Sequence, residues 1–263
     1  MIKRPIWTYI QIGTSLRYLQ EAAEGDLLKE KDNPSWILDN IKWILDSLDK
    51  FGLPVTKRAS TKLRQFYYKY KNCKFGSRLT QEQASELEEI VINLRHTHTA
   101  EAKGIFAYIV TDKRIDVDKL LDDVPSLFSP RTFQLMPDIA QYDFMQAGKC
   151  IAYELPTAAA FHALRGTEST LRLYYCNYIK QRRLTALLWR PMVGHLRKCK
   201  KPIPKILLDN LDNIAVNFRN PTAHPEYKYD INEAQDLFNL CVDVNNRMIG
   251  ELIKHKLIPP QQA

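Results

Sequence analysis

The sequence predicts a mainly α-helical protein, on three observations. Apolar residues recur at helical spacing over most of the chain, capping motifs precede several of these stretches, and only one short apolar run resembles a β-strand. The 263 residues suffice for one large domain or two ordinary ones. We predict an N-terminal, mainly helical region at residues 1–139 with a short β-strand or hairpin, and an antiparallel four-helix bundle at residues 140–263.

The N-terminal region begins with helical patterns and then changes in character. Apolar spacing predicts helices at about residues 6–23, 35–51 and 80–94. Thr80 and Gln83 form a capping box before the third helix. The run Ile105–Val110 is the strand candidate, and residues 115–117 are its nearest hairpin partner. Three prolines between residues 124 and 138 predict a connecting segment.

The C-terminal region is more regular. Apolar spacing predicts four amphipathic helices at about residues 156–179, 184–199, 203–218 and 230–252. Pro156 suits the first turn of the first helix, Pro191 should kink or restart the second, and Asp230 with Glu233 forms a capping box for the fourth. Short connections between four such helices favour an antiparallel bundle.

Positive charge is concentrated in two stretches. The chain has 38 basic and 30 acidic residues, a formal charge of +8. Residues 57–78 include eight basic residues and residues 172–205 include ten, with no acidic residue in either stretch, so the remaining 20 basic and 30 acidic residues leave −10. Such stretches suit a polyanion such as RNA, although solvated helix faces are an alternative explanation. The predicted RNA-binding residues are Lys62, Arg64, Lys69, Lys71, Lys180, Arg182, Arg183, Arg190, Arg197 and Lys198.

The first basic stretch also contains four aromatic residues, Phe66, Tyr67, Tyr68 and Tyr70. Aromatic side chains beside basic ones can stack on unpaired bases. The alternative is that these rings pack in the hydrophobic core.

Several protein classes are disfavoured by composition. No apolar run approaches the roughly 20 residues of a membrane-spanning helix, and no secretory signal follows Met1. Five scattered cysteines without a CxxC pair indicate reduced thiols. We therefore expect a cytoplasmic protein with no membrane partner, no metal and no cofactor.

A short polar motif, Arg219-Asn220-Pro221-Thr222-Ala223-His224, separates the third and fourth predicted helices of the bundle. Because proline disfavours a helical residue before it, the third helix should end near Arg219. On an unbroken helix Arg219 and His224 would lie about 140° apart, whereas a break lets both face one phosphate. Arg190 and His195 have the same spacing, but apolar neighbours indicate that His195 is a packed core histidine.

With this motif, the sequence resembles the HEPN superfamily of small helical-bundle proteins, many of which are RNases. The family motif is Arg, a polar residue, three variable residues and His, and residues 219–224 match it at each position. Residues 155–168 also look like the first long helix of such proteins. The resemblance covers residues 140–256 and implies a metal-independent endoribonuclease, often a toxin or an antiviral (anti-phage) defence effector. It further implies a homodimer with a composite active site and allows a regulatory partner protein.

The resemblance implies roles for three residues. His224 is the expected general base for a ribose 2′-OH, and Arg219 is expected to hold the phosphoryl oxygens, so that cleavage leaves a 2′,3′-cyclic phosphate. Asn220 can orient the phosphate or the imidazole. A non-catalytic RNA-, nucleotide- or protein-binding module of the same shape is the alternative hypothesis, and chance occurrence of the motif is a third.

A carboxylate lies on the apolar stripe of the first bundle helix. Glu168 shares this stripe with Phe161 and Leu164, where an unpaired charge would be costly. Arg165 and Arg172 are both within helical reach of it. Glu168 either positions Arg219 at the site or belongs to a structural ion pair, and the sequence does not decide between these roles.

Overall fold

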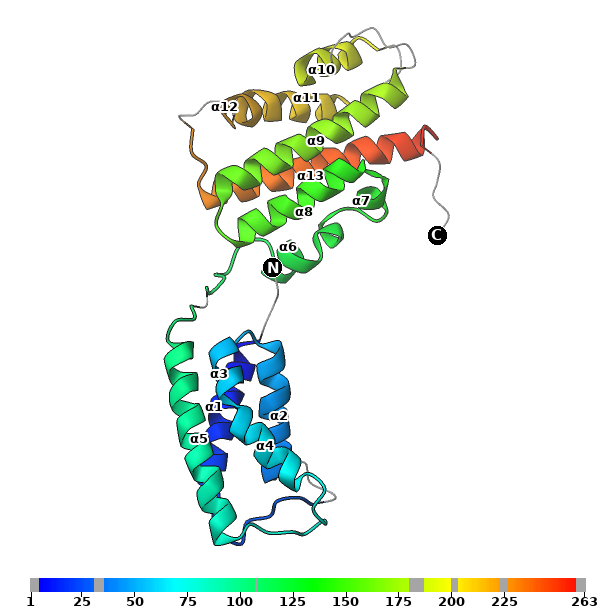
Figure 1. Ribbon diagram of the computed structural model, residues 1–263. Coiled ribbons are helices and arrows are strands. Elements are labelled where there is room, and N and C mark those ends of the chain that lie inside the picture. The colour runs from blue at the N-terminus through cyan, green and yellow to red at the C-terminus, as the bar shows by residue number, and fades with distance from the viewer. Residues whose placement is uncertain are drawn as a thin grey trace. The chain divides into compact units, whose positions relative to one another are not determined.

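The computed structural model describes residues 5–30, 36–106, 108–179, 187–199, 203–222 and 227–258. The chain forms two compact units, Met1–Tyr108 and Ile109–Ala263 (Figure 1). Both units are helical, and the described residues contain no β-strand, only an isolated bridge between Leu27 and Arg78. The predicted mainly α-helical class is therefore correct.

In its described residues, the first unit contains five helices that share one hydrophobic core. They are α1 (Ile6–Gln20), α2 (Ile37–Lys50), α3 (Pro54–Ala59), α4 (Thr61–Tyr70) and α5 (Gln81–Ala102). Helix α1 packs against α2 and α5, and α4 packs against the same two helices. The predicted capping box is confirmed, since the Gln83 N–H donates to Thr80 Oγ1 and the Thr80 N–H donates to Gln83 Oε1. The sequence did not identify α3 and α4.

The predicted strand at Ile105–Val110 is wrong. The side chains of Phe106, Tyr108 and Ile109 are more than four-fifths exposed, and no ladder forms with another segment among the described residues. Val117, in the predicted partner segment, instead begins helix α6 (Val117–Asp122). A β-prone run forms a strand only when a neighbouring strand satisfies its backbone groups, and here the expected neighbour is a bend at Ile115 that leads into α6, with the Ile115 N–H donating to Gln235 Oε1.

Residues 109–139 belong to the second unit. Besides α6, this segment contains the short helices η1 (Val124–Leu127) and α7 (Thr132–Leu135). Leu120 and Val124 are buried in the same core as the long helices of this unit. Gly148 allows the close packing, because a Cβ there would lie 2.6 Å from the Leu120 carbonyl oxygen. The division thus lies after Tyr108, whereas the sequence placed it between residues 139 and 140.

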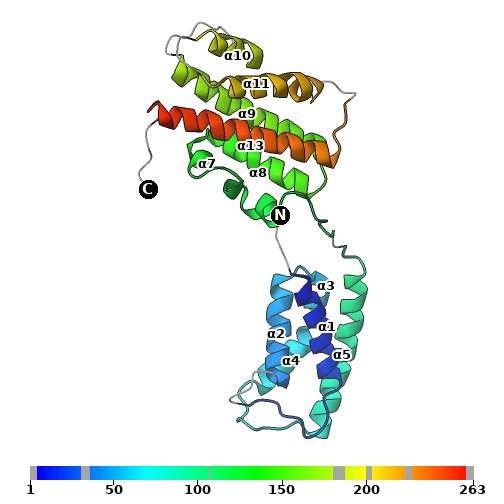
Figure 2. The same cartoon turned by 180° about the vertical axis from the view of Figure 1, so that it is seen from behind.

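Three long helices lie side by side at the centre of the second unit (Figures 1 and 2). They are α8 (Asp138–Ala152), α9 (Pro156–Tyr178) and α13 (Ile231–Lys254), and α9 packs against both others. Helix α11 (Lys205–Ile214) packs on α13, and α10 (Trp189–Arg197) packs on α9 and α11. The sequence did not predict α8. It also predicted a helix over residues 184–199, but the described helix begins at Trp189, so that Pro191 falls in its first turn, where no N–H is needed.

Specific polar contacts join these helices. Trp189 Nε1 donates a 3.0 Å hydrogen bond to the Leu211 carbonyl, which fixes α10 on α11. The buried Asn245 of α13 donates to Thr167 Oγ1 of α9 over 3.0 Å. The capping box of α13 is confirmed, since Asp230 accepts from the N–H of Glu233. Of these contacts, the one between Asn245 and Thr167 fixes α13 against α9.

The helix before the motif continues further than predicted. A π-helical turn, η2 (Ala215–Arg219), follows α11, and helical backbone extends through α12 (Asn220–Thr222). Asn220 is helical (φ −64°, ψ −51°) despite preceding a proline, so the predicted end near Arg219 is wrong. In this wider turn the Asn220 N–H donates to the Ala215 carbonyl, five residues back. Pro221 has no N–H to donate and follows directly after this wider turn.

Candidate functional site

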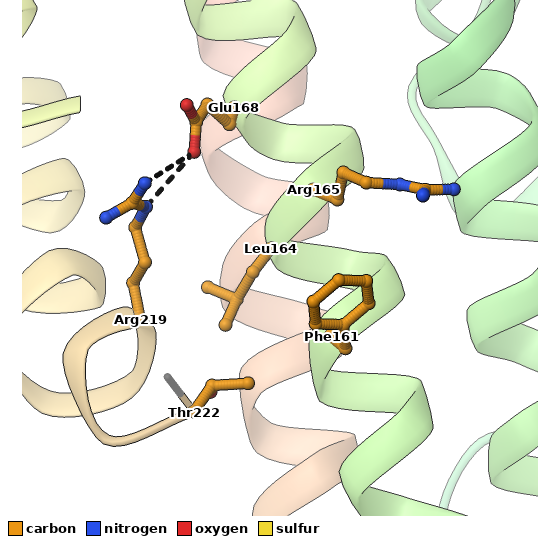
Figure 3. A pocket seen from close by; sticks show the side chains of 6 residues that line it. All are labelled: Phe161, Leu164, Arg165, Glu168, Arg219 and Thr222. Carbon is orange, nitrogen blue, oxygen red and sulfur yellow. Dashed lines mark hydrogen bonds and ion pairs between the residues drawn. The ribbon is translucent and has the colours of Figure 1, made fainter. Parts of the chain in front are cut away.

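A pocket of about 240 Å³ lies between α9 and the segment formed by η2 and α12. Figure 3 shows the side chains around it, four from α9 and two from the facing segment. The lining residues are Phe161, Leu164, Arg165, Glu168, Arg219 and Thr222. The pocket therefore unites the arginine of the motif with the carboxylate that the sequence singled out.

Glu168 binds two arginines. Its Oε2 accepts hydrogen bonds from Arg219 Nε (3.1 Å) and Nη2 (3.0 Å), and its Oε1 accepts one from Arg172 Nη2 (2.8 Å). The predicted reach of Arg172 to Glu168 is confirmed. The Glu168 side chain is 15% exposed and that of Arg219 is 37% exposed, so the pair lies at the edge of the pocket rather than inside the core. Two cations on one carboxylate leave a local charge of +1.

Arg165 does not join this cluster. Its guanidinium points away from Arg219 (Figure 3) and donates to Asp143 of α8, from Nε over 2.7 Å and from Nη2 over 2.5 Å. These hydrogen bonds to Asp143 raise the pKa of Arg165 above its usual range. The sequence places Arg165 within helical reach of Glu168 as a supporting residue of the site, but a fully buried carboxylate on the neighbouring helix binds it instead.

The same carboxylate binds a histidine that the sequence did not assign to the site. His162 Nδ1 lies 2.9 Å from Asp143 Oδ1, and the Asp143 side chain is 0% exposed. Gly166 allows α8 and α9 to approach this closely, because a Cβ there would lie 3.2 Å from the Asp143 Cβ. The sequence signal for this role is an acidic residue on the buried face of α8, Asp143 itself. Finding it required recognising α8 as a helix.

Two hydroxyl groups stabilise the segment formed by η2 and α12. Thr222 Oγ1 and the Tyr229 hydroxyl both donate to the Phe218 carbonyl, over 2.7 and 3.0 Å, and lie 2.7 Å from each other. Tyr229 is buried, and burial raises the pKa of its hydroxyl. This contact fixes the residues on either side of Arg219. Sequence reasoning did not identify it.

The remaining motif residues are only partly placed. Asn220 is half-buried on α12, and its side chain has no hydrogen-bond partner among the described residues. His224 lies outside the described residues. The predicted convergence of His224 with Arg219 therefore stays a prediction.

The second basic stretch is only partly paired where it is described. Lys180, Arg182 and Arg183 lie outside the described residues. Arg197 binds Asp209 and Asp212 through contacts of 2.6–3.0 Å. Arg190 and Lys198 of this stretch are exposed, with no ion pair to any described residue.

The first basic stretch lies on and around α4 of the other unit. Lys62 is exposed, Arg64 is paired with Asp49, Lys69 is paired with Glu86, and Lys71 Nζ lies 4.5 Å from the ring centre of Tyr68. The four aromatic residues divide between the two interpretations: Phe66 is 1% exposed in the core, whereas Tyr68 is 57% exposed beside lysines.

His195, the second histidine at this spacing, has a structural contact. It is half-buried, and its Nδ1 lies 2.7 Å from the Tyr175 hydroxyl between α10 and α9. This contact agrees with the predicted packing role of His195, so the second Arg-to-His spacing, Arg190 to His195, does not mark a functional site.

Comparison with known proteins yields no relative: no family model, curated protein or solved structure matches this chain. Over the described part of the chain, no helix is long and apolar enough to cross a membrane. The same residues contain no cluster of three or more His, Cys, Asp or Glu side chains suited to a metal ion. The chemistry of the site is therefore argued from its own residues.

Proposed function

We propose that this protein is a metal-independent endoribonuclease with a HEPN-like helical bundle, acting as a toxin or an anti-phage defence effector. The observation that carries the proposal is the Arg219 guanidinium, held by Glu168 at the edge of a pocket and five residues before His224. A homodimer would bring two copies of the motif into one cleft, and light scattering of the purified protein tests for this dimer.

Arg219 is suited to binding a phosphate. Its Nε and Nη2 contact Glu168, whereas Nη1 has no partner among the described residues and the side chain is 37% exposed. A guanidinium donates to phosphoryl oxygens in a planar fork and offsets the charge that develops on a five-coordinate phosphorus. Glu168 restricts the rotation of the guanidinium, so we assign it as a positioning residue rather than a catalytic one.

The reaction needs one proton acceptor and no metal. His224 takes the proton of the 2′-OH, the 2′-oxygen forms a bond to phosphorus, and the bond to the 5′-oxygen breaks. The leaving 5′-oxygen takes up a proton from the imidazolium, so the products are a 2′,3′-cyclic phosphate and a 5′-hydroxyl. Exposed basic residues such as Arg190 and Lys198 would hold the rest of the RNA.

Cleavage of total RNA in EDTA tests this function. The wild type should produce cyclic-phosphate ends, His224→Ala should abolish them, and Arg219→Ala should lower the rate by about 100- to 1,000-fold, as expected for losing a group that stabilises the transition state. Arg247→Ala is the matched control, because Arg247 is also a partly exposed arginine bound to a carboxylate, Asp243 of its own helix. No cleavage by the wild type, or equal cleavage by all variants, contradicts the proposal.

The second candidate is a non-catalytic RNA-, nucleotide- or protein-binding module. It is favoured by the ion pair between Arg219 and Glu168, because an arginine bound to a carboxylate can have a purely structural role. RNA binding that weakens steeply with salt but yields no cyclic phosphate would support this candidate over the nuclease.

A further inference from the structure

The aromatic ring of Phe161 is placed unlike a core residue. The sequence assigns Phe161 to the apolar stripe of α9, but its side chain is 52% exposed and lines the pocket. Leu164 and Thr222 lie beside it, and Arg219 with Glu168 lies at the other end of the pocket (Figure 3). The pocket thus has an apolar, aromatic end and a charged end.

Two side chains lie next to this ring, and one buried carboxylate binds both of them. The Arg165 guanidinium carbon lies 5.9 Å from the ring centre of Phe161, and the His162 ring lies 6.2 Å from it at an interplanar angle of 79°. Arg165 and His162 both bind the fully buried Asp143. An exposed ring with fixed neighbours loses little side-chain freedom when a ligand contacts it.

We propose that Phe161 stacks on an unpaired base of the RNA whose phosphate Arg219 holds. This inference rests on the proposed function and names the substrate class of the same site, single-stranded RNA around the cleaved bond. A base can reach the ring only when it is free of its own stack, whereas the interior bases of a duplex have both faces covered. A nucleotide complements the two ends of the pocket, because its aromatic base matches the end at Phe161 and its anionic phosphate matches the end at Arg219.

Binding of a non-cleavable oligonucleotide tests the stacking directly. The probe is a single-stranded 2′-fluoro oligoribonucleotide that contains 2-aminopurine and lacks the attacking hydroxyl. Stacking contributes about 1–3 kcal/mol per base, so Phe161→Leu should weaken binding by about fivefold to 140-fold and reduce the quenching of 2-aminopurine. Phe106→Leu is the matched control, because Phe106 is 82% exposed and lies outside the pocket, and it should bind as the wild type does.

A duplex probe supplies the second comparison. Annealing the complementary strand should weaken wild-type binding, whereas Phe161→Leu should bind the single strand and the duplex about equally. Wild-type affinity and quenching in Phe161→Leu, or no binding of the probe by the wild type, would overturn the stacking role. Because the probe cannot be cut, a wild type that stacks the base but cleaves no RNA contradicts the nuclease alone.

Discussion

Two carboxylates of the second unit each bind two side chains with nitrogen donors, but they differ in burial. Asp143 of α8 is 0% exposed and binds His162 and Arg165, both from α9. Glu168 of α9 is 15% exposed and binds one arginine of its own helix and Arg219 from the facing segment. The first cluster joins two long helices within the core, and the second lies at the edge of a pocket.

This difference in burial predicts a difference in role. A fully buried carboxylate is tolerated only with all its partners in place, so Asp143 must keep its contacts whenever the unit is folded. Water reaches Glu168, so its ion pairs can break and form again at modest cost. In the proposed reaction Arg219 keeps Glu168 as its partner and offers its remaining Nη1 to a phosphate, and only the more exposed cluster gives a phosphate this access.

The largest expected effect on stability is that of Asp143→Ala. Removing one partner of a buried ion pair typically costs 3–5 kcal/mol, and because Arg165 and His162 can turn to solvent, we expect about 3 kcal/mol. Hydrogen exchange of the α8 and α9 amides measures this loss as faster local opening. Asp236→Ala is the matched control, since Asp236 also binds an arginine, Arg114, but is 59% exposed, and it should cost less than about 1 kcal/mol.

Equal exchange rates in these two variants would contradict the structural role of Asp143. Cleavage activity of Asp143→Ala, measured well below its unfolding temperature, separates stability from chemistry. It should fall far less than that of Arg219→Ala, because Asp143 touches neither the motif nor the proposed phosphate position.

Local signals explain which helices the sequence predicts. The capping boxes at Thr80 and Asp230 correctly mark the starts of α5 and α13, because these hydrogen bonds form within four residues. Helix α8 was missed because its buried face includes Ala140, Ala147 and Gly148, small residues with a weak hydrophobic signal despite full burial. Their packing depends on α6 and α9, which no local pattern reveals.

The site was predictable where its residues share a helix. The reach from Glu168 to Arg172 follows from helical spacing and is confirmed. The partner of Arg165 is Asp143, which lies on another helix, so its choice depended on how α8 packs. Phe161 was expected in the core because its spacing fits the apolar stripe, but the stripe is wider than the buried face, and the ring faces the pocket.

Compared with Asp143→Ala, Glu168→Gln is expected to lower stability less and the cleavage rate more. The amide keeps the shape but loses the charge that restricts Arg219, so kcat should fall by about tenfold through misplacement of the guanidinium. RNA should bind as tightly or more tightly, because a negative charge near the phosphate has been removed. Single-turnover cleavage and RNA titrations measure the two quantities. A merely structural ion pair would lower stability and leave kcat of the folded enzyme unchanged.

The smallest effect is expected for Arg172→Ala. Arg172 is 51% exposed and pairs with Glu168 four residues earlier on the same helix, an arrangement that contributes about 0.3–0.5 kcal/mol. Thermal unfolding should therefore change little, and cleavage should stay within about threefold, because Arg219 still has Glu168 as its partner. If Arg172→Ala instead lowered cleavage as much as Glu168→Gln, both arginines would act through one coupled network. The double variant Glu168→Gln/Arg172→Ala would then cleave RNA no more slowly than either single variant. The residues of the exposed cluster would be as interdependent as those of the buried one.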